Sequence, residues 1–170
     1  DLTISAPVVL ALGQTWNVAA LRTLSVNGGV SGSAALTITG SGTVSLGGVA
    51  THNGGTTINS GSTLQVSAVN VLPNGMNAAS SGGDLTVNGL LDLNGTAQAI
   101  NGLLGSGTVD NTGAGAATLT LGVNNDASTF SGIIPNTGGA LALVKNGTAG
   151  LNLSGINTYS GGTTLNGGTL

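Results

Sequence analysis

The chain contains one pattern of residues twice. Leu36–Asn59 aligns with Leu143–Asn166 without a gap, and 10 of the 24 aligned positions are identical. The shared residues are mostly Gly, Thr and Leu. Long-range repetition is typical of stacked units, each of which packs only on its neighbours. Such a chain distributes its functional surface along a face that repeats, and does not concentrate it in one pocket.

Apolar residues recur at positions i and i+2, which is the period of a β-strand. Such pairs include Leu10/Leu12, Leu36/Ile38, Val44/Leu46, Leu85/Val87 and Leu151/Leu153. Asn-Gly dipeptides separate many of these segments, and both residues tolerate the positive φ of tight bends. No segment keeps helical spacing over a helical length, so we expect essentially no helix.

Short strands with Asn-Gly turns fit an antiparallel sandwich or a parallel solenoid. The long-range repeat, the medium-sized aliphatic residues and the scarcity of charges that protect sheet edges favour the solenoid. At about 20 residues per coil, the 170 residues predict roughly eight coils. We expect one solenoid segment over 1–170, with a protruding loop at 68–83, where alternation is weakest. We interpret it as a fragment of a longer repeat protein.

Composition excludes several classes of protein. Mean hydropathy is +0.38 and the net charge is only −3, which argues against disorder. Gly, Ser, Asn and Thr interrupt the uncharged stretch 23–83 every few residues, so no membrane span is predicted. The two cations, Arg22 and Lys145, are too few to neutralise nucleic-acid phosphates. Because Cys is absent, disulfides and thiolate metal sites are excluded.

Catalytic chemistry has few candidate residues. Asp92 and Asp110 lie about one coil apart and are predicted neighbours, as a glycan-cleaving carboxylate pair would require. Solvated turn residues are the simpler interpretation of both. The single His52 lacks a serine elbow near it. We therefore predict no catalytic, cofactor-binding or metal-binding residues.

Three further patterns resemble known binding sites only in part. Gly82-Gly83-Asp84 resembles a calcium-binding repeat but occurs once. Gly54-Gly55 and Gly161-Gly162 lack the lysine of a phosphate loop. The triplets T-I-T (37–39) and T-L-T (118–120) leave an ice-binding face as an alternative, although they do not recur at one coil spacing. Asn59, Asn157 and Asn166 are expected to stack in amide ladders.

The segment L-N-L-S-G-I-N-T-Y-S-G-G-T-T-L-N-G-G-T-L (151–170) closely resembles the autotransporter-associated β-strand repeat of bacterial surface proteins. Leu36–Val66 resembles a second copy, with His52 in the place of Tyr159 and Ile38 in the place of Lys145. The stretches 15–28, 91–109 and 128–134 resemble connecting segments of such proteins. The resemblance implies a right-handed parallel β-helix that is exported to the bacterial cell surface.

The repeat implies scaffold and not activity. We expect a surface-displayed stalk, adhesin or fibre component without catalysis. Its expected partners are further copies of itself and a cell-surface or host-matrix ligand, because low charge offers little repulsion between rods. A polysaccharide-cleaving β-helix and an ice-binding solenoid remain the alternatives.

Overall fold

The computed structural model describes residues 1–74 and 82–170. Within them every regular element is a β-strand, and every strand pairing is parallel. The seven-stranded sheet contains β3 (Gln14–Val18), β6 (Leu36–Gly40), β8 (Thr56–Ile58), β10 (Leu85–Val87), β13 (Leu103–Gly105), β16 (Ser128–Phe130) and β18 (Leu151–Leu153). The six-stranded sheet contains β1 (Leu2–Ile4), β4 (Thr23–Val26), β7 (Thr43–Leu46), β9 (Thr63–Val66), β11 (Leu90–Asp92) and β14 (Thr108–Asp110).

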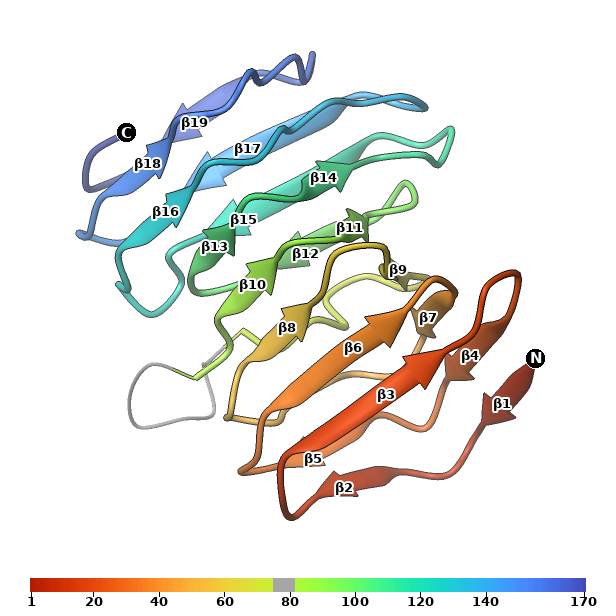
Figure 1. The fold of residues 1–170 in the computed structure, drawn as a ribbon. Helices are drawn as coiled ribbons and strands as arrows, with labels where there is room; N and C mark the ends of the chain where they lie inside the picture. Colours follow the sequence, from red (N-terminus) through yellow and green to blue (C-terminus); the bar gives the residue numbers. More distant parts are fainter. Residues whose placement is uncertain (75–81) are drawn as a thin grey trace.

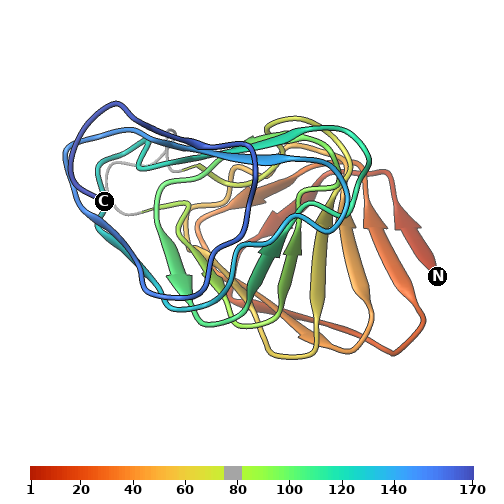
Figure 2. The ribbon, with the colours of Figure 1, turned by 90° about the horizontal axis from the view of Figure 1, so that it is seen from above.

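A third face completes each coil. It contains β2 (Val8–Leu10) and β5 (Val30–Gly32) at one end, and β12 (Ala97–Ala99), β15 (Ala117–Leu121), β17 (Leu141–Lys145) and β19 (Thr163–Leu165) at the other. The chain visits the seven-stranded sheet, the six-stranded sheet and the third face in turn, and each strand pairs with its counterpart one coil later. The result is a right-handed parallel solenoid of about seven turns, which confirms the predicted fold (Figure 1). Figure 2 shows the same stack from above.

The core is a set of columns of aliphatic side chains. Strand alternation turns Leu36 and Ile38 of β6 inward, with exposed fractions of 1% and 0%. The register then stacks like on like, as in the column Leu24, Val44, Leu64, Leu91 and Val109. Full burial of each such side chain contributes about 1.5–3 kcal/mol. Leu12 departs from the predicted pairing with Leu10: it follows β2 and is 76% exposed.

Glycine is required where successive coils touch at their corners. A Cβ on Gly28 would lie 2.1 Å from the carbonyl oxygen of Ala6, and one on Gly107 would lie 2.2 Å from that of Gly89. Both contacts are with backbone of the preceding coil, which cannot rotate away. The abundance of glycine therefore reflects close stacking of backbones at corners.

The two copies of the repeat lie on different faces of the solenoid. Leu36 and Thr56 of the first copy belong to β6 and β8 of the seven-stranded sheet. Their aligned partners, Leu143 and Thr163, belong to β17 and β19 of the third face. The repeat therefore specifies a path of strand, corner and strand, while its rotational position around the rod is set by the coils in between.

The third face is interrupted between β5 and β12. Ala50 bridges to Val30, and its N–H donates to the carbonyl of Val71, but no described residue of 50–74 forms a strand on this face. Of the predicted loop 68–83, residues 75–81 lie outside the described part of the chain. Val71 and Leu72 are buried in the core.

The side chain of Gln98, on β12, takes the place of the missing strand bonds. Its Oε1 accepts the N–H groups of Val71 at 3.0 Å and Leu72 at 3.2 Å. Its Nε2 donates to the carbonyl oxygen of Ala68 at 2.7 Å and to Oγ1 of Thr96 at 2.8 Å. One buried amide thus satisfies backbone groups that a β-ladder satisfies elsewhere.

Candidate functional site

Asp92 and Asp110 are neighbours, as their spacing predicts. They are register partners on β11 and β14, with exposed fractions of 3% and 6%. Asp92 accepts Nε2 of Gln65 at 2.8 Å, and it accepts both Oγ1 (2.7 Å) and the N–H (3.1 Å) of Thr112. Asp110 accepts Oγ1 and the N–H of Thr137 at 2.7 and 2.9 Å. Each carboxylate therefore ties its own turn to a threonine further along the chain.

These bonds make the pair unsuited to glycan cleavage. A general acid needs a raised pKa and a proton that it can deliver to substrate. Burial raises the pKa of Asp92, but hydrogen bonds from Gln65 and Thr112 outweigh it and hold that pKa below its ordinary value. Both residues lie at turns and accept neighbouring backbone N–H groups, but the expectation that they are solvated is wrong, because both are buried.

Asp84 and Asp126 lie at another corner, where Asn101 joins them. The buried Asn101 donates from Nδ2 to both carboxylates, and its Oδ1 accepts the N–H of Asn124 at 3.0 Å. Burial raises the pKa of Asp84, and the charge of Asp126 raises it further. Asp84 also accepts the N–H of Gly102 at 2.9 Å. Across residues 1–74 and 82–170, no group of three or more His, Cys, Asp or Glu side chains could hold a metal ion.

The ring that differs between the two repeats makes the same contact in both. Nε2 of His52 lies 2.8 Å from Oγ1 of Thr56, and the hydroxyl of Tyr159 lies 2.7 Å from Oγ1 of Thr163. We call this contact the ring–threonine clasp. It joins the corner residue to the strand that begins four residues later. The exchange of His for Tyr thus preserves a structural bond, and no serine nucleophile takes part in it.

His52 is nevertheless unusual among the buried polar residues. It is 1% exposed, and its Nδ1 has no hydrogen-bond partner among residues 1–74 and 82–170. Burial lowers the pKa of His52. A neutral imidazole is therefore built into the interior beside the interruption of the third face, and its protonation would place an uncompensated charge there.

Lys145 and the asparagines complete the polar set. Lys145 points inward from the end of β17, is 1% exposed, and donates from Nζ to the carbonyl oxygens of Asn146 and Gly147. Burial lowers its pKa. One step of the expected amide ladder forms at Asn166, whose Nδ2 donates to Oδ1 of Asn146 at 2.8 Å. Asn157 instead accepts the N–H of Ile134.

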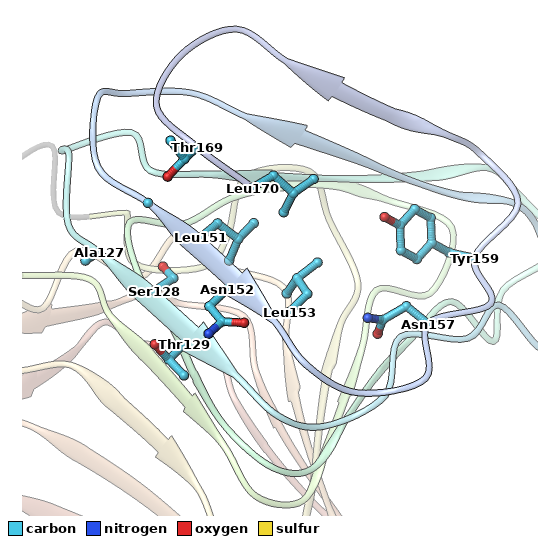
Figure 3. Close-up of a pocket in the computed structure, with 11 residues that line it drawn as sticks. Ala127, Ser128, Thr129, Leu151, Asn152, Leu153, Asn157, Tyr159, Thr169 and Leu170 are labelled. Atoms are coloured by element: carbon cyan, nitrogen blue, oxygen red, sulfur yellow. The ribbon is translucent and has the colours of Figure 1, made fainter.

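A hollow of about 650 Å³ lies at the C-terminal end of the coil stack (Figure 3). Leu151, Leu153 and Leu170 project into it, with Tyr159 and Asn157 along one side. Leu151 and Leu153 occupy the inward positions that a following coil covers elsewhere in the solenoid. The hollow therefore lies over the inward side of this coil, and its described lining combines leucines with uncharged polar residues.

The outward face of the seven-stranded sheet is regular in a way that sequence inspection missed. The triplets at 37–39 and 118–120 lie on β6 and β15, which belong to different faces, so they do not form one surface. Single threonines from separate coils do align. Their column runs Thr15, Thr37, Thr57, Thr86, Leu104, Thr129 and Asn152.

Comparison with known proteins agrees with this architecture. The family model of the passenger-associated-transport-repeat matches residues 36–66 and 143–170, the same two copies. The "Adhesin BmaC autotransporter" of Brucella suis biovar 1 (strain 1330) is 36% identical over 158 residues, which is 89% of this chain and 4% of that protein. No solved structure matches. Among the described residues, no helix is long and apolar enough to cross a membrane.

The solenoid and its repeats define a passenger-type β-helix. The two repeats and the similarity to an autotransporter adhesin support a segment of an autotransporter passenger, secreted and exposed on the bacterial cell surface. It spans 4% of the length of the curated relative that it matches.

Proposed function

We propose that this chain is a rigid, non-catalytic stalk segment of a surface adhesin, which holds adhesive surfaces away from the cell and contributes to contact with a cell-surface or host-matrix ligand. The observation that carries the proposal is the use of the buried polar side chains. Asp92, Asp110, Asn101 and Gln98 all bond across coils, so they stabilise the rod and are not available for chemistry.

The mechanical part follows from the ladder. Two faces are paired through nearly every coil, and coil-to-coil contacts are the only tertiary contacts that a solenoid needs. A rod of seven stacked strands at about 4.8 Å per step is about 30 Å long. Adhesion itself is supported by the relative's name, "Adhesin BmaC autotransporter".

Beads coated with the purified chain test the proposal. We expect them to bind host-cell monolayers or immobilised matrix more than albumin-coated beads do. The matched control is Gly107→Val, which places a side chain against the backbone of the preceding coil and should abolish both the fold and the binding. Binding by the folded chain that does not exceed albumin would contradict an adhesive role. The double variant Asp92→Asn/Asp110→Asn should bind like the wild type if its circular dichroism is unchanged.

A further inference from the structure

Asparagine followed by glycine is the chemically most labile pair of residues in this chain. The backbone nitrogen of the glycine can attack Cγ of the asparagine and displace its amide nitrogen, because glycine has no side chain that blocks the approach. The corners of the solenoid contain many such pairs. Those that lie wholly within the described residues are 27–28, 53–54, 88–89, 94–95, 101–102, 146–147 and 166–167.

The fold divides these pairs by the state of the glycine N–H. The N–H of Gly89 donates to a backbone carbonyl at 3.0 Å, and those of Gly95 and Gly102 donate to side-chain oxygens at 2.6 and 2.9 Å. An N–H that is held in a hydrogen bond points away from the asparagine amide and is harder to deprotonate. The glycine N–H makes no hydrogen bond with the described residues in the pairs 27–28, 53–54, 146–147 and 166–167.

The pair Asn146–Gly147, which follows β17, has two further contacts that favour the attack. Nδ2 of Asn166 donates to Oδ1 of Asn146 at 2.8 Å, so it can stabilise the negative charge that this oxygen gains when Cγ is attacked. Nζ of Lys145 donates to the carbonyl oxygen of Asn146, which belongs to the same peptide group as the N–H of Gly147. An ammonium at this oxygen stabilises the anion that forms when the N–H loses its proton.

The three other pairs with a free glycine N–H have neither contact. Within residues 1–74 and 82–170, no donor bonds to the amide oxygen of Asn27, Asn53 or Asn166, and no cation bonds to their backbone carbonyls. A nucleophile, a polarised amide and a cation on the reacting peptide group therefore come together at Asn146 alone among the described pairs.

We propose that Asn146 is a site of spontaneous deamidation, which converts it to aspartate or isoaspartate in the folded chain. The nitrogen of Gly147 loses its proton to solvent and bonds to Cγ. The Cγ–Nδ2 bond breaks, and Nδ2 takes up a proton from solvent and leaves as ammonia. Water then opens the cyclic imide at either of its two carbonyls. Asn146 and Gly147 are half-buried, so water reaches this corner. The inference does not depend on the adhesive role.

Deamidation changes the charge of this corner. Lys145 is 1% exposed, and burial lowers its pKa without an opposing carboxylate among the described residues. The reaction creates a carboxylate on the next residue, and a nearby opposite charge favours the protonated lysine. The isoaspartate product also adds one methylene to the backbone between β17 and β18. The modified corner therefore exchanges an amide ladder step for a pair of opposite charges.

Peptide mapping by tandem mass spectrometry, on the whole chain incubated at mildly alkaline pH, tests the proposal. In the folded chain we expect Asn146 to convert faster than Asn27, Asn53 and Asn166. In guanidinium chloride, which removes the fold, the four sites should convert at similar rates. The variant Lys145→Met removes the ammonium and should slow conversion of Asn146 about tenfold. The matched control Arg22→Met removes the chain's other cation and should leave that rate unchanged.

Three results would overturn the inference: another described pair that converts first in the folded chain, a lead of Asn146 that persists in guanidinium chloride, or equal rates in Lys145→Met and the wild type. The comparison of the folded and unfolded wild type needs no substitution. The test therefore holds even if Lys145→Met misfolds.

Discussion

Replacement of Gln98 by leucine should destabilise the solenoid more than most single substitutions do. The side chain is 1% exposed and satisfies the N–H groups of Val71 and Leu72 and the carbonyl of Ala68. Leucine has a similar size but cannot form these bonds, so two buried N–H groups and one half-buried carbonyl lose their partner. Each unsatisfied group costs about 1–3 kcal/mol, and partial relaxation gives an expected loss of about 3–6 kcal/mol in the free energy of unfolding.

Urea denaturation followed by circular dichroism measures this loss. The matched control is Gln14→Leu, because Gln14 is an exposed glutamine on β3 whose side chain makes only a 3.5 Å contact with the carbonyl of Leu12. We expect it to change stability by less than about 0.5 kcal/mol. A Gln98→Leu variant as stable as Gln14→Leu would refute the claim that this amide replaces the missing strand.

Three other predictions concern the buried polar groups and the corners. The folded pKa of His52 lies below its ordinary value of 6.5, so the unfolded chain takes up the proton first as pH falls. The free energy of unfolding should therefore fall as pH drops below about 6.5, by at most about 1.4 kcal/mol per pH unit. The variant His52→Tyr, which recreates the clasp of Tyr159 and Thr163, should lose this pH dependence in denaturation measured from pH 7.5 to 5. Asp92→Asn should lower the free energy of unfolding by about 1–3 kcal/mol at neutral pH. Because the folded pKa of Asp92 is lowered, this difference from the wild type should shrink as pH falls through that pKa. A difference that stays unchanged at acid pH would count against the bonded carboxylate. Gly107→Ala should lower the melting temperature clearly, whereas Gly13→Ala, whose new Cβ would have no heavy atom within 4 Å, should not.

The alternation of apolar residues predicted the strands. The long-range repeat, the medium-sized aliphatic residues and the scarcity of charges that protect sheet edges predicted the parallel stack. The spacing of Asp92 and Asp110 predicted their contact, since one short coil separates them. The faces of the two repeats could not be predicted in this way. Coil length varies: Thr56 pairs with Leu85, 29 residues later, while Leu85 pairs with Leu103, 18 residues later.

The same variation hides the threonine column of the seven-stranded sheet and the role of Gln98. Thr37, Thr57 and Thr86 align in space but stand at unequal intervals in the sequence, so no fixed period reveals them. Gln98 bonds to residues 68–72 of the preceding coil, which carry no strand pattern of their own. A sequence shows which residues can form a ladder, but it does not show where a ladder is broken and a side chain must replace it.

Cross-coil disulfide formation tests the register of the seven-stranded sheet, on which the solenoid depends. The native chain has no Cys, so engineered pairs have no competitors. Thr57→Cys/Thr86→Cys places two register partners on the same side of adjacent strands, at a Cα separation near 4.8 Å that suits a disulfide. Thr57→Cys/Leu85→Cys shifts one residue to the inward side. We predict rapid oxidation of the first pair and little of the second; equal or reversed oxidation would contradict this register.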